Sequence, residues 1–241
     1  MKKITTYRDI TVIQNEPFIV LATDSSGSIG EKEQDYLPIK TEIAATYCLR
    51  VCLAELFAVG AVPEVFISTV SNEFEPTGRK ILTEIKKQCE RYNITDYEVN
   101  GSSEENFPST MTGFGITVLG SAKELHWKQT RVEDHCYLYG IPRVGQAVLE
   151  NESTLLNPSI IQTLLTQYEI HDLLPCGSSG IQREIEVLCD EMNLSFEYHK
   201  RLNPEMLKKS AGPATCGIFT SSESISGENI RLLGHFKKGN D

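Results

Sequence analysis

Residues 40–63 read KTEIAATYCLRVCLAELFAVGAVP and predict a long helix followed by a turn. One polar stripe runs along this helix at i, i+4 spacing, formed by Glu42, Thr46 and Arg50. The rest of its surface is apolar, so we expect most of the helix to be buried. Gly60 and Pro63 end it, because glycine favours the position after a helix and proline cannot continue one.

Glu55 lies inside the apolar surface of this helix, seven residues after Cys48 and four after Val51. A buried carboxylate without a partner costs several kcal/mol. Glu55 must therefore meet a metal ion, a hydrogen-bond donor or a buried cation such as an arginine. The residues alone leave these alternatives open.

Apolar runs of strand length and amphipathic runs of helix length alternate along the rest of the chain. Strands are predicted at 17–23, 64–70, from 97, 113–119, 136–139, 173–175, 194–199, 214–220 and 230–236. Further helices are predicted at 76–92, 160–168, 181–192 and 204–209, with polar loops at 25–33 and 100–108. We therefore predict an α+β fold class with two domains, residues 1–128 and 129–241.

The chain of 241 residues is acidic, because 23 lysines and arginines against 33 aspartates and glutamates give a net charge of −10. This balance argues against a nucleic acid or an anionic membrane as the main partner, since both attract basic surfaces. The N-terminus shows no apolar signal-peptide segment, and the most apolar stretch, 51–70, is interrupted by charges and a proline. The seven cysteines form no CxxC pair, which favours reduced thiols. We expect a cytoplasmic protein.

Several common catalytic motifs are missing from the sequence. It contains no GxxxxGK[ST], no GxGxxG that opens a helix, no GxSxG and no HExxH. The five histidines share no metal-ligand spacing. A P-loop, a dinucleotide-binding fold, a serine-hydrolase elbow and a zinc-protease site are therefore disfavoured.

Three acids are candidates for metal chemistry. Asp24 follows an apolar strand, where a carboxylate can present oxygen to Mg²⁺ or act as a turn residue. Glu104 lies in the Gly/Ser loop 100–108 and could equally be a solvated loop charge. If Asp24, Glu55 and Glu104 converge, like charges about 4 Å apart repel by about 4 kcal/mol. A divalent metal would then stabilise them, and it would also neutralise nucleotide phosphates.

Two glycine-containing segments are candidates for phosphate binding. Residues 177–180 (GSSG) lie between a predicted strand and a predicted helix, where free N–H groups favour an anion, although an ordinary tight turn has the same pattern. Residues 208–213 (KKSAGP) place lysines beside another turn, where they either contact phosphate or form a solvated basic patch.

Four segments occur in the order seen in the AIR-synthase-related (PurM-like) ATP-binding superfamily, which the chain resembles over nearly its whole length. They are residues 22–24 (ATD), 48–63 (CLRVCLAELFAVGAVP), 100–102 (NGS) and 113–120 (GFGITVLG). The resemblance implies an N-terminal domain of β-sheet and helices that forms a homodimer, and a C-terminal α/β domain. It also implies that acidic residues and Mg²⁺ hold ATP without a P-loop.

The resemblance implies metal-binding roles for individual acids. Asp24 matches a Thr-Asp pair after the first long strand, and Glu55 matches a helix acid that most members have as aspartate. Asp9 is the nearest candidate for a pair of N-terminal aspartates that this chain lacks, and Glu104 could replace the aspartate of a Gly-Gly-Asp loop. The implied catalytic residues are Asp24 and Glu55, together with Lys40 at the start of the long helix.

The resemblance also implies phosphate-binding roles. Gly101 matches the second glycine of the Gly-Gly-Asp loop, and Ser102 stands in the place of its aspartate. A Ser-Asp-Gly segment found in thiamine-monophosphate kinase appears here as Ser178, Ser179 and Gly180, without the aspartate. Lys209 is a further candidate to contact phosphate.

Residues 139–145 (YGIPRVG) and 209–215 (KSAGPAT) look most like the α-ribazole kinase branch of the superfamily. This likeness implies a kinase that uses ATP and Mg²⁺ to phosphorylate a nucleoside hydroxyl, with α-ribazole as the acceptor in cobamide salvage. The alternatives are ATP-dependent ligation or cyclisation and chemistry like that of thiamine-monophosphate kinase. The changed residues Ser102 and Ser179 also leave open a nucleotide-sensing module without catalysis.

Overall fold

The computed structural model describes residues 3–150 and 152–239, which form two compact units. Unit 1 consists of the described residues up to Leu56 and of Ala61–Glu124, and unit 2 consists of Phe57–Gly60 and of the described residues from Leu125 onward. Helices and strands are mixed in both units, so the predicted α+β class is confirmed. Among the described residues, no helix combines the length and the apolar character needed to cross a membrane.

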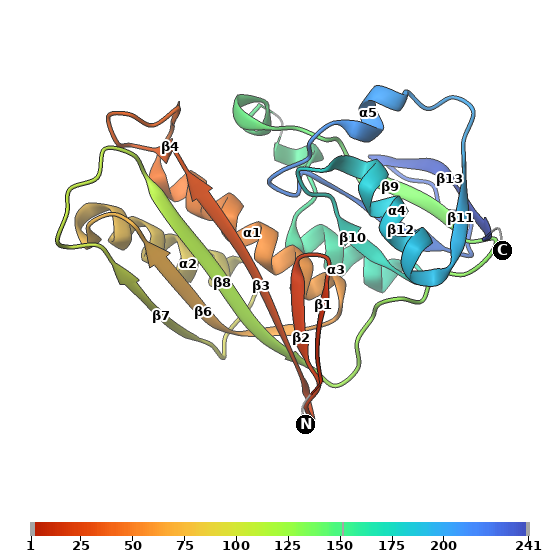
Figure 1. Ribbon diagram of the computed structural model, residues 1–241, viewed down its shortest axis with the longest axis horizontal. Coiled ribbons are helices and arrows are strands. Elements are labelled where there is room, and N and C mark those ends of the chain that lie inside the picture. The colour runs from red at the N-terminus through yellow and green to blue at the C-terminus, as the bar shows by residue number, and fades with distance from the viewer. Residues whose placement is uncertain (1–2, 151, 240–241) are drawn as a thin grey trace. The chain divides into compact units, whose positions relative to one another are not determined.

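Unit 1 is built on a six-stranded sheet with the strand order β1-β2-β3-β8-β6-β7 (Figure 1). The strands are β1 (Ile4–Tyr7), β2 (Ile10–Ile13), β3 (Phe18–Gly27), β6 (Val62–Val70), β7 (Glu98–Ser103) and β8 (Gly113–Ala122). Neighbouring strands are antiparallel except for β6 and β7, which are parallel.

Two helices cover one face of this sheet (Figure 1). They are α1 (Thr41–Ala58) and α2 (Arg79–Arg91), and a π-helical turn at Phe74–Gly78 leads into α2. The short strands β4 (Ile29–Gly30) and β5 (Leu37–Pro38) pair with each other in the connection between β3 and α1.

Alternating burial along β8 identifies the packed face of the sheet. Ile116 and Val118 are fully buried, and the Cys52 thiol of α1 donates a hydrogen bond to the Ile116 carbonyl oxygen at 3.3 Å. Gly120 follows on the same face, where a Cβ would come within 2.8 Å of the Leu56 side chain. Glycine at this position therefore allows α1 to approach the sheet closely.

The polar stripe of α1 does not face solvent throughout. Thr46 Oγ1 donates to Glu84 Oε1 of α2 at 2.7 Å. Arg50 is only 4% exposed, and its guanidinium lies over the Tyr47 ring. The expectation of a mostly buried helix is confirmed, and part of its polar stripe is a contact between helices.

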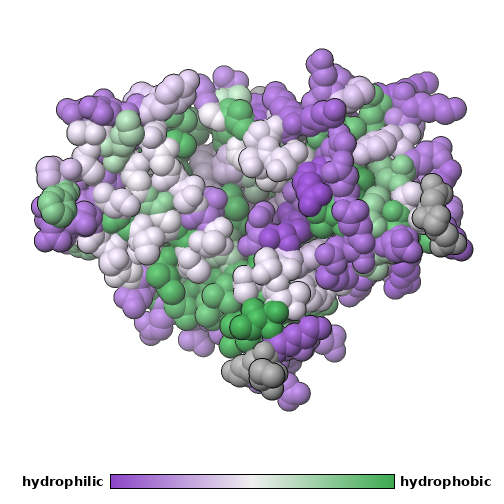
Figure 2. Space-filling view, in the orientation of Figure 1, coloured by the Kyte–Doolittle hydropathy of each residue, from purple (hydrophilic) through white to green (hydrophobic). Residues whose placement is uncertain are grey.

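The opposite face of the sheet, here called the outer face, carries half-exposed apolar side chains. Strand register places Ile4, Ile13 and Ile19 in one row, and Leu21, Leu119 and Val65 in another. In Figure 2, apolar side chains gather over this part of the sheet. Ile4 is 64% exposed, and the others are partly buried.

Unit 2 contains a five-stranded antiparallel sheet with the order β10-β12-β9-β13-β11. Its strands are β9 (His135–Gly140), β10 (Leu173–Pro175), β11 (Leu194–Tyr198), β12 (Cys216–Ser221) and β13 (Ile230–Lys238). Its helices are α3 (Pro158–Gln167), α4 (Gly180–Met192) and α5 (Pro204–Lys208), with 3₁₀ turns at Gly145–Val148 and Glu152–Thr154. Ile181, Ile185 and Leu188 of α4 pack in one core cluster with residues of β9, β12 and β13, which confirms the amphipathic helix predicted at 181–192.

Two strands extend into segments that were predicted as loops. Residues 25–27 continue β3 and pair with Gly113–Gly115 of β8, so Asp24 lies inside the strand and not at its end. Residues 100–103 continue β7 beside β6. Both extensions are polar or glycine-rich, so backbone pairing holds them where no apolar pattern exists. The hairpin of β1 and β2 is a further element that the sequence analysis did not predict.

Candidate functional site

Asp24 points toward the helical face of the unit 1 sheet. It follows the buried residues Val20 and Ala22 at alternate positions of β3 and pairs in register with Ile116. The Cys48 thiol of α1 makes a hydrogen bond to its carboxylate. The polar residue therefore occupies a position that belongs to the core by strand alternation.

Burial raises the pKa of Asp24 above its ordinary value, and the charge of Asp9 acts in the same direction. Hydrogen bonds from the backbone of Ser25 and from Cys48 oppose this rise. Burial also raises the pKa of the Cys48 and Cys52 thiols, with the charge of Asp24 adding to the effect. Both thiols are consequently protonated at neutral pH, and the Cys48 thiol donates to the Asp24 carboxylate while the Cys52 thiol donates to the Ile116 carbonyl oxygen.

Glu55 forms a buried ion pair with Arg8, which lies in the turn between β1 and β2. Arg8 Nη1 is 2.9 Å from Glu55 Oε2, Nη2 is 3.3 Å from Oε1, and each side chain is 5% exposed. A buried arginine was one of the partners left open for Glu55. The same turn carries Asp9 into the electrostatic range of Asp24.

The region around this turn has an uneven charge balance. Glu55 has Arg8 as an ion-pair partner, whereas the charge of Asp9 acts on Asp24 in the direction that raises its pKa. A cation near Asp9 and Asp24 would relieve the repulsion between these two charges.

Gly101 and Ser102 line a hollow of about 220 Å³ beside β6, β7 and α2. A Cβ on Gly101 would collide with the carbonyl oxygen of Ser68, so glycine is required for β7 to pair closely with β6. Asp24, Ile116, Ser68 and Gly101 occupy one register row across β3, β8, β6 and β7. Three interstrand steps of about 4.8 Å separate Asp24 from Gly101 by about 14 Å.

Glu104 lies beyond the end of β7 and therefore apart from Asp24 and Glu55. Its N–H is 3.0 Å from the carbonyl oxygens of Val70 and Asn72, and its carboxylate accepts a hydrogen bond from the Asn106 N–H at 2.7 Å. This last bond lowers the pKa of Glu104. Within residues 3–150 and 152–239, no group of three or more His, Cys, Asp or Glu side chains could hold a metal ion.

Lys40 directly precedes α1 and is exposed. Its carbonyl oxygen accepts the Ile43 N–H at 2.9 Å and so belongs to the first turn of the helix. The lysine is available for an anion in solution, and its place at the start of the helix agrees with the prediction.

The predicted phosphate-binding segments of unit 2 lie side by side. Gly180 begins α4 with φ of +80°, and a Cβ there would come within 2.9 Å of the carbonyl oxygens of Leu207 and Lys209. The Ala211 N–H donates to the Gly177 carbonyl oxygen at 3.1 Å. Ser178, Ser179 and Lys209 are exposed, so the structure brings these candidates together on the surface where α4 begins.

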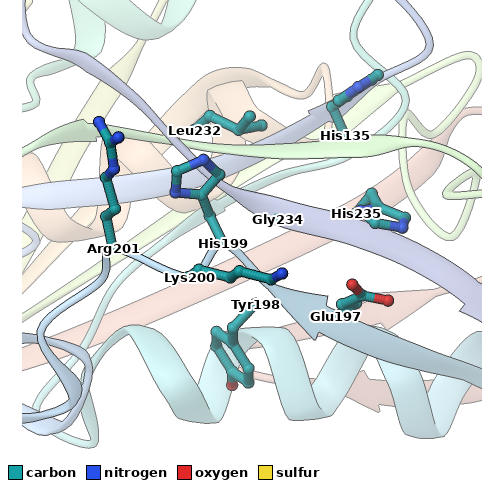
Figure 3. Close-up of a pocket in the computed structure, with 9 residues that line it drawn as sticks. All are labelled: His135, Glu197, Tyr198, His199, Lys200, Arg201, Leu232, Gly234 and His235. Carbon is teal, nitrogen blue, oxygen red and sulfur yellow. The ribbon is translucent and has the colours of Figure 1, made fainter.

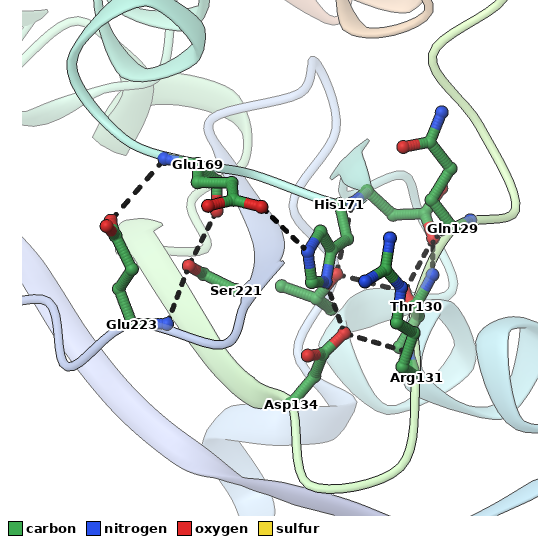
Figure 4. A network of polar contacts seen from close by, with 10 residues as sticks. Gln129, Thr130, Arg131, Asp134, Glu169, His171, Ser221 and Glu223 are labelled. Atoms are coloured by element: carbon green, nitrogen blue, oxygen red, sulfur yellow. Dashed lines mark hydrogen bonds and ion pairs between the residues drawn. The ribbon is translucent and has the colours of Figure 1, made fainter.

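A separate buried network in unit 2 anchors the segment that enters β9 (Figure 4). Asp172 Oδ2 accepts hydrogen bonds from the backbone N–H groups of Gln129 and Thr130 at 2.9 and 2.8 Å, and from Thr130 Oγ1 at 2.5 Å. His171 Nδ1 lies 2.6 Å from Asp134 Oδ2. These contacts join loop backbone to the sheet, and we assign the network a structural role.

Three residues of the Asp24 region were not predicted as part of the site, namely Arg8, Cys48 and Cys52. Arg8 is 47 positions away from Glu55 in the chain. Its position next to Asp9 in a short polar turn was the available signal, but that turn was not recognised as a hairpin. The two cysteines follow the apolar periodicity of α1 and looked like ordinary core residues.

No family model and no curated protein matches this chain. Thiamine monophosphate kinase from Aquifex aeolicus matches in structure with a TM-score of 0.69 and 14% identity, over 98% of this chain and 90% of that chain. A structure described as AaThiL complexed with AMPPCP and TMP has a TM-score of 0.68 and 14% identity, over 96% and 85% of the two chains. The chain has the PurM-like fold. The hydrogenase maturation protein HypE in complex with ATP shares this PurM-like fold with a TM-score of 0.61 and 11% identity, over 91% of this chain and 77% of that chain.

Proposed function

We propose that this protein is an ATP-dependent kinase that phosphorylates a hydroxyl group of a small molecule. The observation that carries the proposal is the half-buried carboxylate of Asp24 on the packed face of a PurM-like sheet, within electrostatic range of the exposed Asp9 in the β1–β2 turn. Solved proteins of the same fold bind AMPPCP together with TMP, or ATP. Enzymes of phosphoryl transfer bind Mg²⁺ through one or two carboxylates together with the nucleotide phosphates.

Asp9 and Asp24 are better candidates to bind Mg²⁺ than Glu55 and Glu104, the two other acids named from the sequence. Mg²⁺ binds through one or two carboxylates and completes its coordination with water and phosphate oxygens. Burial raises the pKa of Asp24, so a bound cation would stabilise its ionised form, whereas Glu55 already has Arg8 as a partner. When bound, Mg²⁺ would neutralise charge on the transferring phosphoryl group.

The other candidate residues have parts in this proposal that suit their chemistry. Lys40 and Lys209 are exposed cations that can contact phosphate oxygens. The N–H groups at the start of α4, after Ser178 and Ser179, favour an anion because they have no acceptor within the helix. Holding the phosphates in place is the main work of the protein in phosphoryl transfer.

We further propose α-ribazole as the acceptor, which makes the product α-ribazole phosphate. This step rests on the sequence likeness of residues 139–145 and 209–215 to the α-ribazole kinase branch. We also propose a homodimer formed through the outer face of unit 1, because its half-exposed isoleucine and leucine rows would be removed from water there.

A second candidate function is nucleotide sensing without catalysis. The Arg8–Glu55 ion pair favours it, because the arginine neutralises an acid that the family resemblance assigns to metal binding. The serines at positions 102 and 179, where relatives have aspartate, point in the same direction.

The deciding experiment incubates the full chain with Mg-ATP and a panel of nucleosides that includes α-ribazole, and follows the products by ³¹P NMR. A kinase yields a stable phosphomonoester together with ADP. Free phosphate with a new C–N bond would instead identify a ligase or cyclase. Binding of Mg-ATP without turnover of any substrate would identify the sensor.

Matched variants tie this activity to the site. Asp24→Asn should lower turnover by about a hundredfold or more, since loss of one electrostatic group at the reacting centre has effects of this size. Asp96→Asn removes the same charge from an exposed position of unit 1 and should leave turnover unchanged. Equal activity of the two variants would remove Asp24 from the site.

A further inference from the structure

Unit 2 contains a second hollow, of about 610 Å³, that the proposed kinase chemistry does not use (Figure 3). Its volume lies in the range of small-ligand sites. Five basic side chains and one acid line it, namely His135, His199, His235, Lys200, Arg201 and Glu197. In Figure 3, Arg201 lies on one side, His135 and His235 lie on the other, and His199 and Lys200 lie between them.

Strand register builds one wall of this hollow. Glu197 of β11 pairs with His235 of β13, which in turn pairs with His135 of β9. Residues that pair directly across neighbouring strands have Cβ atoms about 5 Å apart and point to the same face. The two imidazole rings are therefore held side by side by the sheet.

The segment after β11 supplies the remaining basic groups. The His199 N–H donates to the Leu233 carbonyl oxygen at 2.8 Å, and the Leu202 N–H donates to the His199 carbonyl oxygen at 3.2 Å. These bonds hold Lys200 and Arg201 beside β13. In the described part of the chain, neither Lys200 nor Arg201 forms an ion pair.

The single acid of the lining does not cancel this charge. Glu197 forms an ion pair with Lys237, which lowers the pKa of its carboxyl group, and the nearby charges of His235 and Lys200 act in the same direction. The fixed charges at the hollow are three positive ones, on Lys200, Arg201 and Lys237, and one negative one, on Glu197. The hollow is therefore positive, although the whole chain has a net charge of −10.

His135 adds an unsatisfied polar atom. Its Nδ1 is buried and has no hydrogen-bond partner among the described residues. The three histidines do not form a metal site among these residues. Imidazole, ammonium and guanidinium groups that line one hollow are donors suited to an anion with several oxygens.

We propose that this hollow binds a small phosphorylated compound through a phosphomonoester or pyrophosphate group. The place is distinct from residues 177–180. Cys176 directly precedes that segment, and its N–H donates to the carbonyl oxygen of Cys216. Cys216 pairs with Gly140 at one end of β9, whereas His135 lies at the other end. Five residue steps of about 3.4 Å separate the two ends by about 17 Å.

The test uses the full chain with ¹⁵N-labelled histidine side chains, titrated with inorganic pyrophosphate and followed by NMR. The signals of His135, His199 and His235 should move together with one dissociation constant. His126 and His171 lie elsewhere in unit 2 and serve as internal controls that should not move. No saturable shift of the first three signals, or equal shifts of all five, would overturn the proposal.

Two charge variants locate the effect. Lys200→Ala/Arg201→Ala should weaken pyrophosphate binding by about tenfold or more, because two charge-assisted contacts are lost. Arg183→Ala removes an exposed arginine of α4 and should bind as wild type does. Equal binding by both variants refutes the proposed site. These readouts do not depend on ATP turnover, so failure here leaves the kinase proposal standing.

Discussion

Arg8 and Glu55 face each other in a buried bidentate ion pair that joins a two-residue hairpin turn to the last turn of α1, with Nη1 and Oε2 2.9 Å apart. The pair fixes the position of the turn, and the turn carries Asp9, whose charge acts on Asp24. Arg8 takes no part in the proposed reaction, but it positions the turn that carries Asp9, one of the two carboxylates that the reaction would use.

Replacing Arg8 by methionine should destabilise the protein by about 3–5 kcal/mol, because the buried Glu55 charge would lose its partner. Urea unfolding measures the loss. Arg8→Met/Glu55→Gln should cost less than the sum of the single changes, since the two groups interact directly.

Arg79→Met is the matched control for this prediction. Arg79 also forms an ion pair, with Glu75, but the two side chains are 61% and 58% exposed, so the variant should lose at most about 1 kcal/mol. If Arg8→Met is no less stable than Arg79→Met, the buried pair does not hold the hairpin.

Asp24 should make the protein less stable as pH rises. Burial raises the pKa of Asp24 in the folded state above its ordinary value of 3.8, so the folded protein holds this proton more tightly than the unfolded chain does. Stability is then greatest below the ordinary pKa and falls as pH rises from the ordinary to the raised value. Asp24→Asn has no such proton, so its stability relative to wild type should increase across this window.

Urea titrations at a series of pH values test the prediction through the difference between variant and wild type, which cancels the contributions of other acids. Asp96→Asn, in an exposed position, should show a constant difference. A constant difference for Asp24→Asn as well would mean that burial does not disfavour the Asp24 charge.

Local patterns in the sequence predicted most helices and strands, but not the partners that complete the site. The helical phase of Glu55 correctly indicated burial, because 3.6-residue periodicity is a property of neighbouring positions. Arg8 could not be assigned as its partner, since the two are brought together by a chain reversal 47 positions away. Likewise, the sequence left open whether Glu104 lies near Asp24, and the strand order places three interstrand steps between β7 and β3.

Gly180→Ala should destabilise unit 2 and weaken Mg-ATP binding. The residue has a φ of +80°, and an added Cβ would press on the carbonyl oxygens of Leu207 and Lys209 at 2.9 Å. The left-handed conformation alone costs about 1–2 kcal/mol. Displacement of the Lys209 segment would add to this cost and would move a proposed phosphate contact.

Gly145→Ala separates the two effects, because Gly145 has a φ of +58° but open space around its Cβ position. This variant should lose only the stability that the left-handed backbone conformation costs, which thermal unfolding measures. Its affinity for Mg-ATP, measured by calorimetric titration, should be unchanged. Identical behaviour of the two variants would show that the contact between Gly180 and the Lys209 segment is unimportant.

Leu21→Lys should convert the proposed homodimer into monomers. Leu21 lies in the central row of the outer face, between strands β2 and β8, and is partly exposed in the single chain. A charge there can remain in water when the chain is alone, but it would have to be desolvated in an apolar interface at a cost of several kcal/mol. Sedimentation velocity of wild type and variant at matched concentrations measures the shift in mass.

Tyr36→Lys, at a loop residue that is 93% exposed, introduces the same charge away from the sheet and should stay dimeric. A wild-type chain that remains monomeric at all concentrations would refute the interface, and a Leu21→Lys variant that remains dimeric would place the interface elsewhere.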